Sequence, residues 1–206
     1  DPATVTITVT GTNDAPVAVA SDEDTTENVV LNGDVTAATD VDGTIASYAL
    51  VEGLSAEEGG SLTFNTDGSY SFNPDSDFDD LAVGVTRDVT FTYTATDNVG
   101  QVSDPATVTI TVTGTNDAPV AGDDSFTVAE DGTTAALNLA GNDTDIDGDT
   151  LSVQSIAGTT LTPGTAQSIA VTNGTVDVTA AGVITFSPDA DYAGPISFNY
   201  DVTDGV

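Results

Sequence analysis

The chain has 206 residues and a formal net charge of -33 at pH 7, because 34 acidic residues are matched by a single basic one, Arg87. Cys, Met, Trp, His and Lys are absent. These absences exclude a disulfide framework, thiol or imidazole catalysis, zinc sites built from Cys or His, and the basic face that nucleic-acid binding needs. The hydrophobic fraction of 38% is high enough for a folded core, so the carboxylates must either spread through solvent or be neutralised by a cation.

The first predicted element is a strand at residues 1–10, where Val or Ile alternates with Thr. Residues 1–18 (DPATVTITVTGTNDAPVA) recur unchanged as residues 104–121, and residues 72–78 match residues 186–192 more loosely. The chain is therefore expected to contain two related units in tandem. The expected boundaries are 1–11 for the last strand of a preceding repeat and the start of a linker, 12–115 for the first repeat, and 116–206 for a second repeat without its final strand.

Further along the chain, short alternating runs are separated by turn signals such as Asp67-Gly68, Asn173-Gly174 and Ala181-Gly182. No helical period of any length is present. About seven short strands per unit predict an all-β fold of two tandem immunoglobulin-like antiparallel β-sandwiches. The aromatic residues on the strand patterns are expected in the cores: Phe64, Tyr70, Phe72, Phe91, Tyr93, Phe186, Phe198 and Tyr200.

The acidic residues are expected to gather in loops, including Asp22-Glu23-Asp24. Carboxylates held close together raise one another's pKa or recruit a cation, and Ca²⁺ suits a flexible set of oxygen ligands better than Mg²⁺ does. Residues 142–149 (NDTDIDGD) begin like an EF-hand calcium loop, but the twelfth position is Gln154 and no helices flank the loop. We interpret it as a calcium loop in a β context, with a solvated acidic turn as the alternative; Asp40-Val41-Asp42-Gly43 is a shorter version.

Several motifs resemble known families. The segments 12–16 and 115–119 (TNDAP) resemble the DxNDN-type linker of cadherins, with Thr in place of the leading Asp. Unit one also resembles VCBS-type repeats in the segment ATVTITVTGTNDAPVA and in residues 60–70, whereas residues 129–132, 141–145 and 186–192 resemble a bacterial cadherin-like repeat. As a whole, the chain resembles the extender repeats of giant type I-secreted, RTX-type bacterial surface adhesins.

The resemblance implies several Ca²⁺ ions, mainly at the junction between domains, and no other cofactor. At the complete junction, the implied ligands are Glu23, Asp75, Asp77, Asn116, Asp117, Asp143, Asp145, Asp147 and Asp204. Asp24 and Glu27 are alternatives to Glu23. At the preceding junction they are Asn13, Asp14, Asp40, Asp42 and Asp97. Glu130, Asp189 and Asp191 are assigned to a following junction.

The function expected from these features is that of calcium-stiffened stalk modules in a secreted bacterial adhesin that acts in surface attachment and biofilm formation. The alternative is a cadherin-like module that binds carbohydrate or another copy of itself. No catalytic residue is expected, and the chain is not expected to be an enzyme. The expected location is the extracellular bacterial cell surface, without membrane insertion by this segment. The expected partners are the neighbouring repeats of the same chain. Further candidate partners are a polysaccharide and a second copy of the protein. In the second case, the strand at residues 1–10 of one copy would complete the second repeat of the other.

Overall fold

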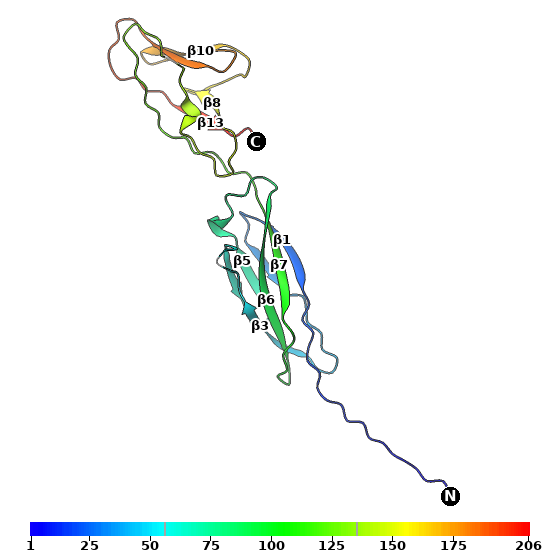
Figure 1. Ribbon diagram of the computed structural model, residues 1–206. Coiled ribbons are helices and arrows are strands. Elements are labelled where there is room, and N and C mark those ends of the chain that lie inside the picture. The colour runs from blue at the N-terminus through cyan, green and yellow to red at the C-terminus, as the bar shows by residue number, and fades with distance from the viewer. Residues whose placement is uncertain (56, 135) are drawn as a thin grey trace. The chain divides into compact units, whose positions relative to one another are not determined.

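The protein is described by a computed structural model that covers residues 1–55, 57–134 and 136–206. The chain divides into two compact units, unit 1 (Asp1–Thr115) and unit 2 (Asn116–Val206) (Figure 1). Strands and turns build both units, and the helical segments among the described residues are two three-residue turns, η1 (Asp75–Asp77) and η2 (Leu139–Gly141). The predicted all-β fold class of two tandem sandwich units is confirmed.

Unit 1 folds its strands into two sheets. One sheet has the order β1-β7-β6-β3 and the other has the order β2-β5-β4. All pairs are antiparallel except β1 with β7, which is parallel. The strands are β1 (Ser21–Thr26), β2 (Leu31–Asp34), β3 (Ile45–Glu52), β4 (Ser61–Phe64), β5 (Ser69–Asn73), β6 (Thr86–Asp97) and β7 (Ala106–Thr113).

The alternation of β7 explains why one of its faces is buried and the other is not. Val108, Ile110 and Val112 are all 0% exposed, whereas the Thr residues between them point away from the core. The predicted hairpin at Asp67-Gly68, between β4 and β5, is confirmed. Gly68 has a φ of +94°, a backbone conformation that is costly for any residue with a side chain. The second sheet then covers the apolar face of the first.

Unit 2 repeats this plan with differences. Its sheets have the orders β10-β11-β12 and β13-β8-β9. The strands are β8 (Ser152–Ile156), β9 (Thr159–Thr160), β10 (Gln167–Val171), β11 (Gly174–Val178), β12 (Ile184–Pro188) and β13 (Tyr200–Thr203). By sequence correspondence, β12 is the counterpart of β5 and β13 the counterpart of the end of β6. The core of unit 2 contains Ile156, Val176 and Phe186.

The aromatic prediction is confirmed. Five of the eight predicted core residues are buried and three are half-buried against a core: Tyr70, Phe72, Phe91, Tyr93 and Phe186 in the first group, and Phe64, Phe198 and Tyr200 in the second. In unit 1, the rings of Tyr70 and Phe91 meet edge to face, with centroids 5.1 Å apart. These aromatic contacts supply a core that the aliphatic side chains alone would leave incomplete.

A tyrosine hydroxyl ties the first segment of each unit to its sheet. Tyr93 Oη donates to the carbonyl oxygen of Val19 at 2.7 Å, and Tyr200 Oη lies 2.7 Å from the carbonyl oxygen of Gly122. Burial raises the pKa of Tyr200, and its hydrogen bond with the Asp143 carboxylate raises it further. Val19 and Gly122 are 103 residues apart in sequence, so the repeat extends from the sequence to individual hydrogen bonds.

Two predictions about secondary structure are wrong. The acidic run Asp22-Glu23-Asp24 lies in strand β1, not in a loop. The physical reason is that β1 is an edge strand, which tolerates charged side chains on its outer face. Residues 1–10 form no strand, because no other segment among the described residues of the chain pairs with them and a strand needs a ladder partner.

The identical sequences around Ile110 and Ile7 give a matched stability test. Ile110→Ala is expected to lower the free energy of unfolding of unit 1 by about 2–5 kcal/mol, because Ile110 is 0% exposed. Ile7→Ala should change it by less than about 0.5 kcal/mol, because Ile7 is 82% exposed. Urea unfolding of both variants measures this, and equal losses would contradict the assignment of the core.

Candidate metal centres

The first residues of unit 2 fold against its acidic loop. The Asn116 Nδ2 amide donates to Asp204 Oδ2 at 2.8 Å, and the Asp117 backbone N–H donates to Asp147 Oδ2 at 2.8 Å. These bonds bring predicted ligands from three distant parts of the sequence, 116–117, 143–149 and 204, into one region. The following Ala118-Pro119 continues toward the bridge of Val120 with Thr144, so the TNDAP segment is anchored within unit 2.

The acidic loop of unit 2 is shaped by its own side chains. Asp145 Oδ1 accepts hydrogen bonds from the backbone N–H groups of Asp147 at 3.0 Å and Asp149 at 3.3 Å. Gly148 has a φ of +79°, which completes the turn. One carboxylate oxygen each from Asp145, Asp147 and Asp149 lies within 4.8 Å of the other two. Asp149 was not among the predicted ligands, although the alternation of Asp from 143 to 149 indicated it.

Several side-chain oxygens of unit 2 are buried and have no hydrogen-bond donor among the described residues. They include Asp143 Oδ2, Asp145 Oδ2 and Asp147 Oδ1, together with Asn116 Oδ1 and Asp124 Oδ2. A buried carboxylate oxygen without a donor or a positive charge is costly. The chain's single basic side chain, Arg87, belongs to unit 1, where it pairs with Asp80 at 2.8 Å. The donor set of unit 2 therefore fits an oxygen-binding cation such as Ca²⁺.

Unit 1 has the same arrangement with fewer carboxylates. Asn13 Nδ2 donates to Asp97 Oδ2 at 2.6 Å, and the Asp14 backbone N–H donates to Asp42 Oδ1 at 3.2 Å. Asp40 Oδ1 accepts from the N–H of Gly43 at 2.6 Å, whereas Asp40 Oδ2 is buried without a donor. The counterpart of Asp143 in this loop is Ala38. All five predicted ligands of the preceding junction thus lie in one region of unit 1.

The asparagine at the start of each unit also tunes a carboxyl group. The hydrogen bond from Asn13 lowers the pKa of Asp97, and backbone N–H groups of residues 99–101 act in the same direction. The hydrogen bond from Asn116 lowers the pKa of Asp204 in the same way. Both carboxyl groups are therefore held in the ionised form that a metal ligand needs.

Glu27, which the sequence offered only as an alternative to Glu23, is 2% exposed. Its Oε1 accepts hydrogen bonds from both the backbone N–H and the hydroxyl of Thr115, each at 2.6 Å, and its Oε2 is buried without a donor. The predicted Glu23 is half-buried in β1. The repeat could have indicated Glu27, because Glu130, predicted as a ligand in unit 2, follows Glu27 by the repeat offset of 103 residues.

The other two predicted ligands of unit 1, Asp75 and Asp77, are the first and last residues of η1. Asp75 accepts hydrogen bonds from the Ser61 hydroxyl at 2.8 Å and from the Asn73 side-chain amide. Asp77 Oδ2 accepts from the backbone N–H of Gly60 at 2.8 Å. These bonds fix the loop after β5, which places both carboxylates beside the turn before β4.

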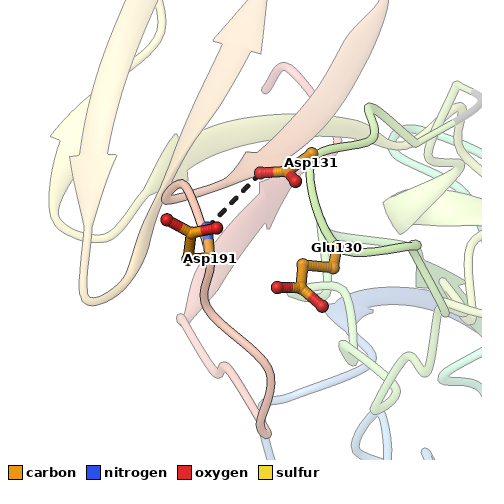
Figure 2. A group of neighbouring side chains, drawn as sticks. All are labelled: Glu130, Asp131 and Asp191. Atoms are coloured by element: carbon orange, nitrogen blue, oxygen red, sulfur yellow. Dashed lines mark hydrogen bonds between the residues drawn. The ribbon is translucent and has the colours of Figure 1, made fainter.

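Unit 2 carries a second acidic group on exposed loops. Oxygens of Glu130, Asp131 and Asp191 lie within 4.8 Å of one another, and the Asp191 backbone N–H donates to Asp131 Oδ1 at 3.3 Å (Figure 2). Figure 2 shows Glu130 and Asp131 on one segment and Asp191 on another. Asp131 was not predicted, and the predicted Asp189 is not part of this group. All three side chains are exposed, so water can solvate them without an ion.

Comparison with known proteins identifies the class to which these two units belong. Residues 13–114 and 116–206 each match the model of the bacterial cadherin-like domain. The chain therefore belongs to the bacterial cadherin-like domain family and contains two copies of the domain. A search of curated proteins gave no match.

The chain also matches solved structures at low sequence identity. Extracellular cadherin domains 1–4 of protocadherin gamma B7 are 15% identical, with a TM-score of 0.39, over 91% of this chain and 48% of that one. The D00–D0 domain of intimin is 14% identical, with a TM-score of 0.31, over 92% of this chain and 97% of that one. The chain spans about half the length of the protocadherin structure, and likeness at this level carries no argument about function. Among the described residues, no helix has the length and hydropathy of a membrane-crossing segment.

The asparagine–aspartate pairs make a testable prediction about pH. In the presence of a chelator, Asn116→Ala is expected to raise the pKa of Asp204 toward its ordinary value of about 3.9. A lowered folded-state pKa stabilises the fold above the ordinary value, and this contribution is lost as the pH falls through the folded pKa. The variant should therefore lose less stability on acidification below about pH 4. Carbon NMR titration of the carboxyl groups measures the pKa directly.

Asn13→Ala is the matched control, because it should shift the pKa of Asp97 and leave Asp204 unchanged. An Asp204 titration that is the same in the wild type and in Asn116→Ala would show that the hydrogen bond is not the cause.

Proposed function

We propose that this chain is a calcium-binding, calcium-stiffened spacer in the stalk of a bacterial surface adhesin. Membership of the bacterial cadherin-like family supports an adhesion or surface module. The finer assignment to a large type I-secreted adhesin rests on the resemblance of the repeats to the extender modules of such proteins. The proposed role is structural: the units separate an adhesive region from the cell and carry no catalytic site.

The observation that carries the proposal is the set of buried carboxylate oxygens without donors in unit 2. Asp143, Asp145 and Asp147 each contribute one such oxygen. Ca²⁺ accepts 6–8 oxygen ligands in flexible geometry, so it can use carboxylates from a loop that is already folded by its own hydrogen bonds. Mg²⁺ requires near-ideal octahedral geometry and keeps its waters, which fits this loop less well.

Stiffening follows from how the chain is held on each side of the division between the units. Thr115, the last residue of unit 1, is bound by Glu27 through its backbone and its hydroxyl. Asn116, the first residue of unit 2, is bound by Asp204. Thr115 and Asn116 are adjacent in sequence, so no unbound residue lies between these two contacts. A cation that neutralises the carboxylates around Asn116 would strengthen the contact of Asn116 with Asp204. Calcium should therefore reduce the freedom of the backbone at this point.

An affinity measurement tests the calcium site. We expect unit 2 to bind Ca²⁺ with a dissociation constant of about 10⁻⁴–10⁻³ M, as extracellular modules do. Asp145→Asn and Asp147→Asn should each weaken binding by about tenfold or more, because each removes one of the clustered charges while keeping the side-chain shape. Isothermal titration calorimetry measures both. Calcium at 100 times the dissociation constant should also raise the stability of unit 2 by about 2.7 kcal/mol.

Asp177→Asn is the matched control for these variants. Asp177 lies on β11, where it accepts a hydrogen bond from Ser168, and it is not part of the acidic loop. Equal affinity in Asp145→Asn, Asp147→Asn and Asp177→Asn would refute the assignment of the site.

Small-angle X-ray scattering tests the stiffening. With millimolar Ca²⁺, the scattering should be fitted by a narrower range of orientations of the two units than with a chelator. The double variant Asp145→Asn/Asp147→Asn should give the chelator-type profile under both conditions. A wild-type profile that does not respond to calcium would contradict the stiffening, even if the ion binds.

A further inference from the structure

A tyrosine hydroxyl of unit 2 lies where several segments meet the acidic loop. Tyr200, the first residue of β13, is half-buried, and its Oη lies 2.7 Å from the carbonyl oxygen of Gly122 and 3.0 Å from that of Leu139. The same Oη lies 3.0 Å from Asp143 Oδ1. A hydroxyl has a single hydrogen to donate, and the carboxylate is the strongest of these acceptors because it is charged. The Tyr200 hydroxyl is therefore expected to donate to Asp143.

The Asp143 carboxylate is held from a second side as well. The backbone N–H of Gly122 donates to Asp143 Oδ1 at 2.8 Å. Asp143 Oδ1 therefore has two donors, whereas Asp143 Oδ2 is buried and has none among the described residues. Two bonds to one oxygen fix the orientation of the carboxylate, so Oδ2 is the oxygen that can bind a ligand.

The segment after Gly122 brings a second carboxylate to the same hydroxyl. Asn142 Nδ2 donates to the carbonyl oxygen of Asp123 at 2.9 Å, and a Cβ at Gly122 would lie 2.9 Å from Asn142 Nδ2, so the two segments pack closely. Asp124 follows directly. Burial raises the pKa of Tyr200, and the neighbouring carboxylates, that of Asp124 among them, raise it further through hydrogen bonding and charge. Asp124 Oδ2 is also buried without a donor among the described residues.

Unit 1 has the same tyrosine without the two carboxylates. Tyr93 Oη donates to the carbonyl oxygen of Val19 at 2.7 Å and lies 3.1 Å from a second backbone carbonyl. Ser21 and Ala38 stand at the positions of the two aspartates. The tyrosine therefore contributes to the fold of both units, and in unit 2 it also contacts acidic side chains.

We propose that Tyr200 is a positioning residue of the calcium site in unit 2, and that its hydroxyl orients Asp143 so that Oδ2 of Asp143 and Oδ2 of Asp124 bind calcium. This inference rests on the proposed function. Because Ca²⁺ takes 6–8 oxygen ligands, it can use these two oxygens in addition to those of the acidic loop. A carboxylate that is already oriented loses less freedom when the ion binds, which strengthens binding.

A calcium titration of the 206-residue chain, followed through the backbone amide NMR signals of residues 143–149, tests the role of the hydroxyl. Tyr200→Phe should raise the dissociation constant by about tenfold or more, as the loss of a group that orients a metal ligand typically does. Tyr93→Phe is the matched control, because it removes the same hydroxyl from unit 1 and should leave this dissociation constant unchanged. Equal dissociation constants in the wild type and in Tyr200→Phe would overturn the proposal.

A double-mutant cycle separates positioning from a general contribution to the fold. Asp143→Ala gives unit 2 the residue that unit 1 has at this position, and it should itself weaken calcium binding. Adding Tyr200→Phe to Asp143→Ala should change the dissociation constant by less than about twofold, because the carboxylate that the hydroxyl orients is already gone. An equal effect of Tyr200→Phe in both backgrounds would mean that the tyrosine acts through the fold, and would contradict the proposal.

The second ligand can be tested without changing the tyrosine, so the result does not depend on whether Tyr200→Phe folds. Asp124→Asn should raise the dissociation constant by about tenfold, because it removes a charged ligand and keeps the shape of the side chain. Asp123→Asn is the matched control, since it removes the same charge from the adjacent, exposed side chain. Equal dissociation constants in Asp124→Asn and Asp123→Asn would refute the assignment of Asp124.

A measurement without calcium separates the failure of this inference from that of the proposed function. In a chelator, the carboxyl carbon-13 NMR signal of Asp143 should shift in Tyr200→Phe and stay unchanged in Tyr93→Phe. A signal that is the same in both variants would overturn the inference, whether or not calcium binds. Calcium that alters none of the amide signals of residues 143–149 in the wild type would overturn the proposed function, and the inference with it.

Discussion

Repulsion between carboxylates, with one arginine to offset it, is the constraint on which the rest of this structure depends. The chain meets it in two ways. Some acids lie on exposed positions, such as the outer face of the edge strand β1, where water screens them. The fold brings other acids together, because an early segment of each unit lies against the acidic loop and an aspartate of the same unit. Asn13 binds Asp97 in unit 1, and Asn116 binds Asp204 in unit 2. The second group contains buried oxygens without hydrogen-bond donors, and a bound cation would stabilise this arrangement.

The larger sheet of unit 1 depends on its central strand β7. β7 lies between β1 and β6, so it holds two otherwise separate segments in one sheet. Where a β7 is present, its neighbours are strands; where none is among the described residues, in unit 2, their counterparts are irregular. The acidic region of unit 2 does not need the β7 ladder, because it is built from residues 116–117, the loop 143–149 and Asp204.

Much of this could be predicted from the sequence, for physical reasons that particular residues illustrate. The alternation around Ile110 predicted a buried strand, and Asp67-Gly68 predicted a hairpin, because both patterns act locally. The loop containing Asp145 and Asp147 could be identified from its spacing and its glycine. The sequence could not decide between Glu23 and Glu27, because the role of Glu27 depends on a contact with Thr115, 88 residues away. The placement of Asp22-Glu23-Asp24 in a strand was missed because charge predicts exposure, and an edge strand is also exposed. Residues 1–10 have strand sequence without strand structure, since pairing is not a local property.

The central claim is that the donorless carboxylate oxygens of unit 2 hold a calcium ion. A crystal grown in millimolar calcium, with anomalous scattering recorded from the ion, tests it most directly. The account predicts an anomalous peak about 2.3–2.6 Å from oxygens of Asp145 and Asp147, with Asp143 or Asn116 among the further ligands. It would be contradicted by a map at the same calcium concentration in which these oxygens contact only water, or in which calcium is found solely at the exposed group of Glu130, Asp131 and Asp191.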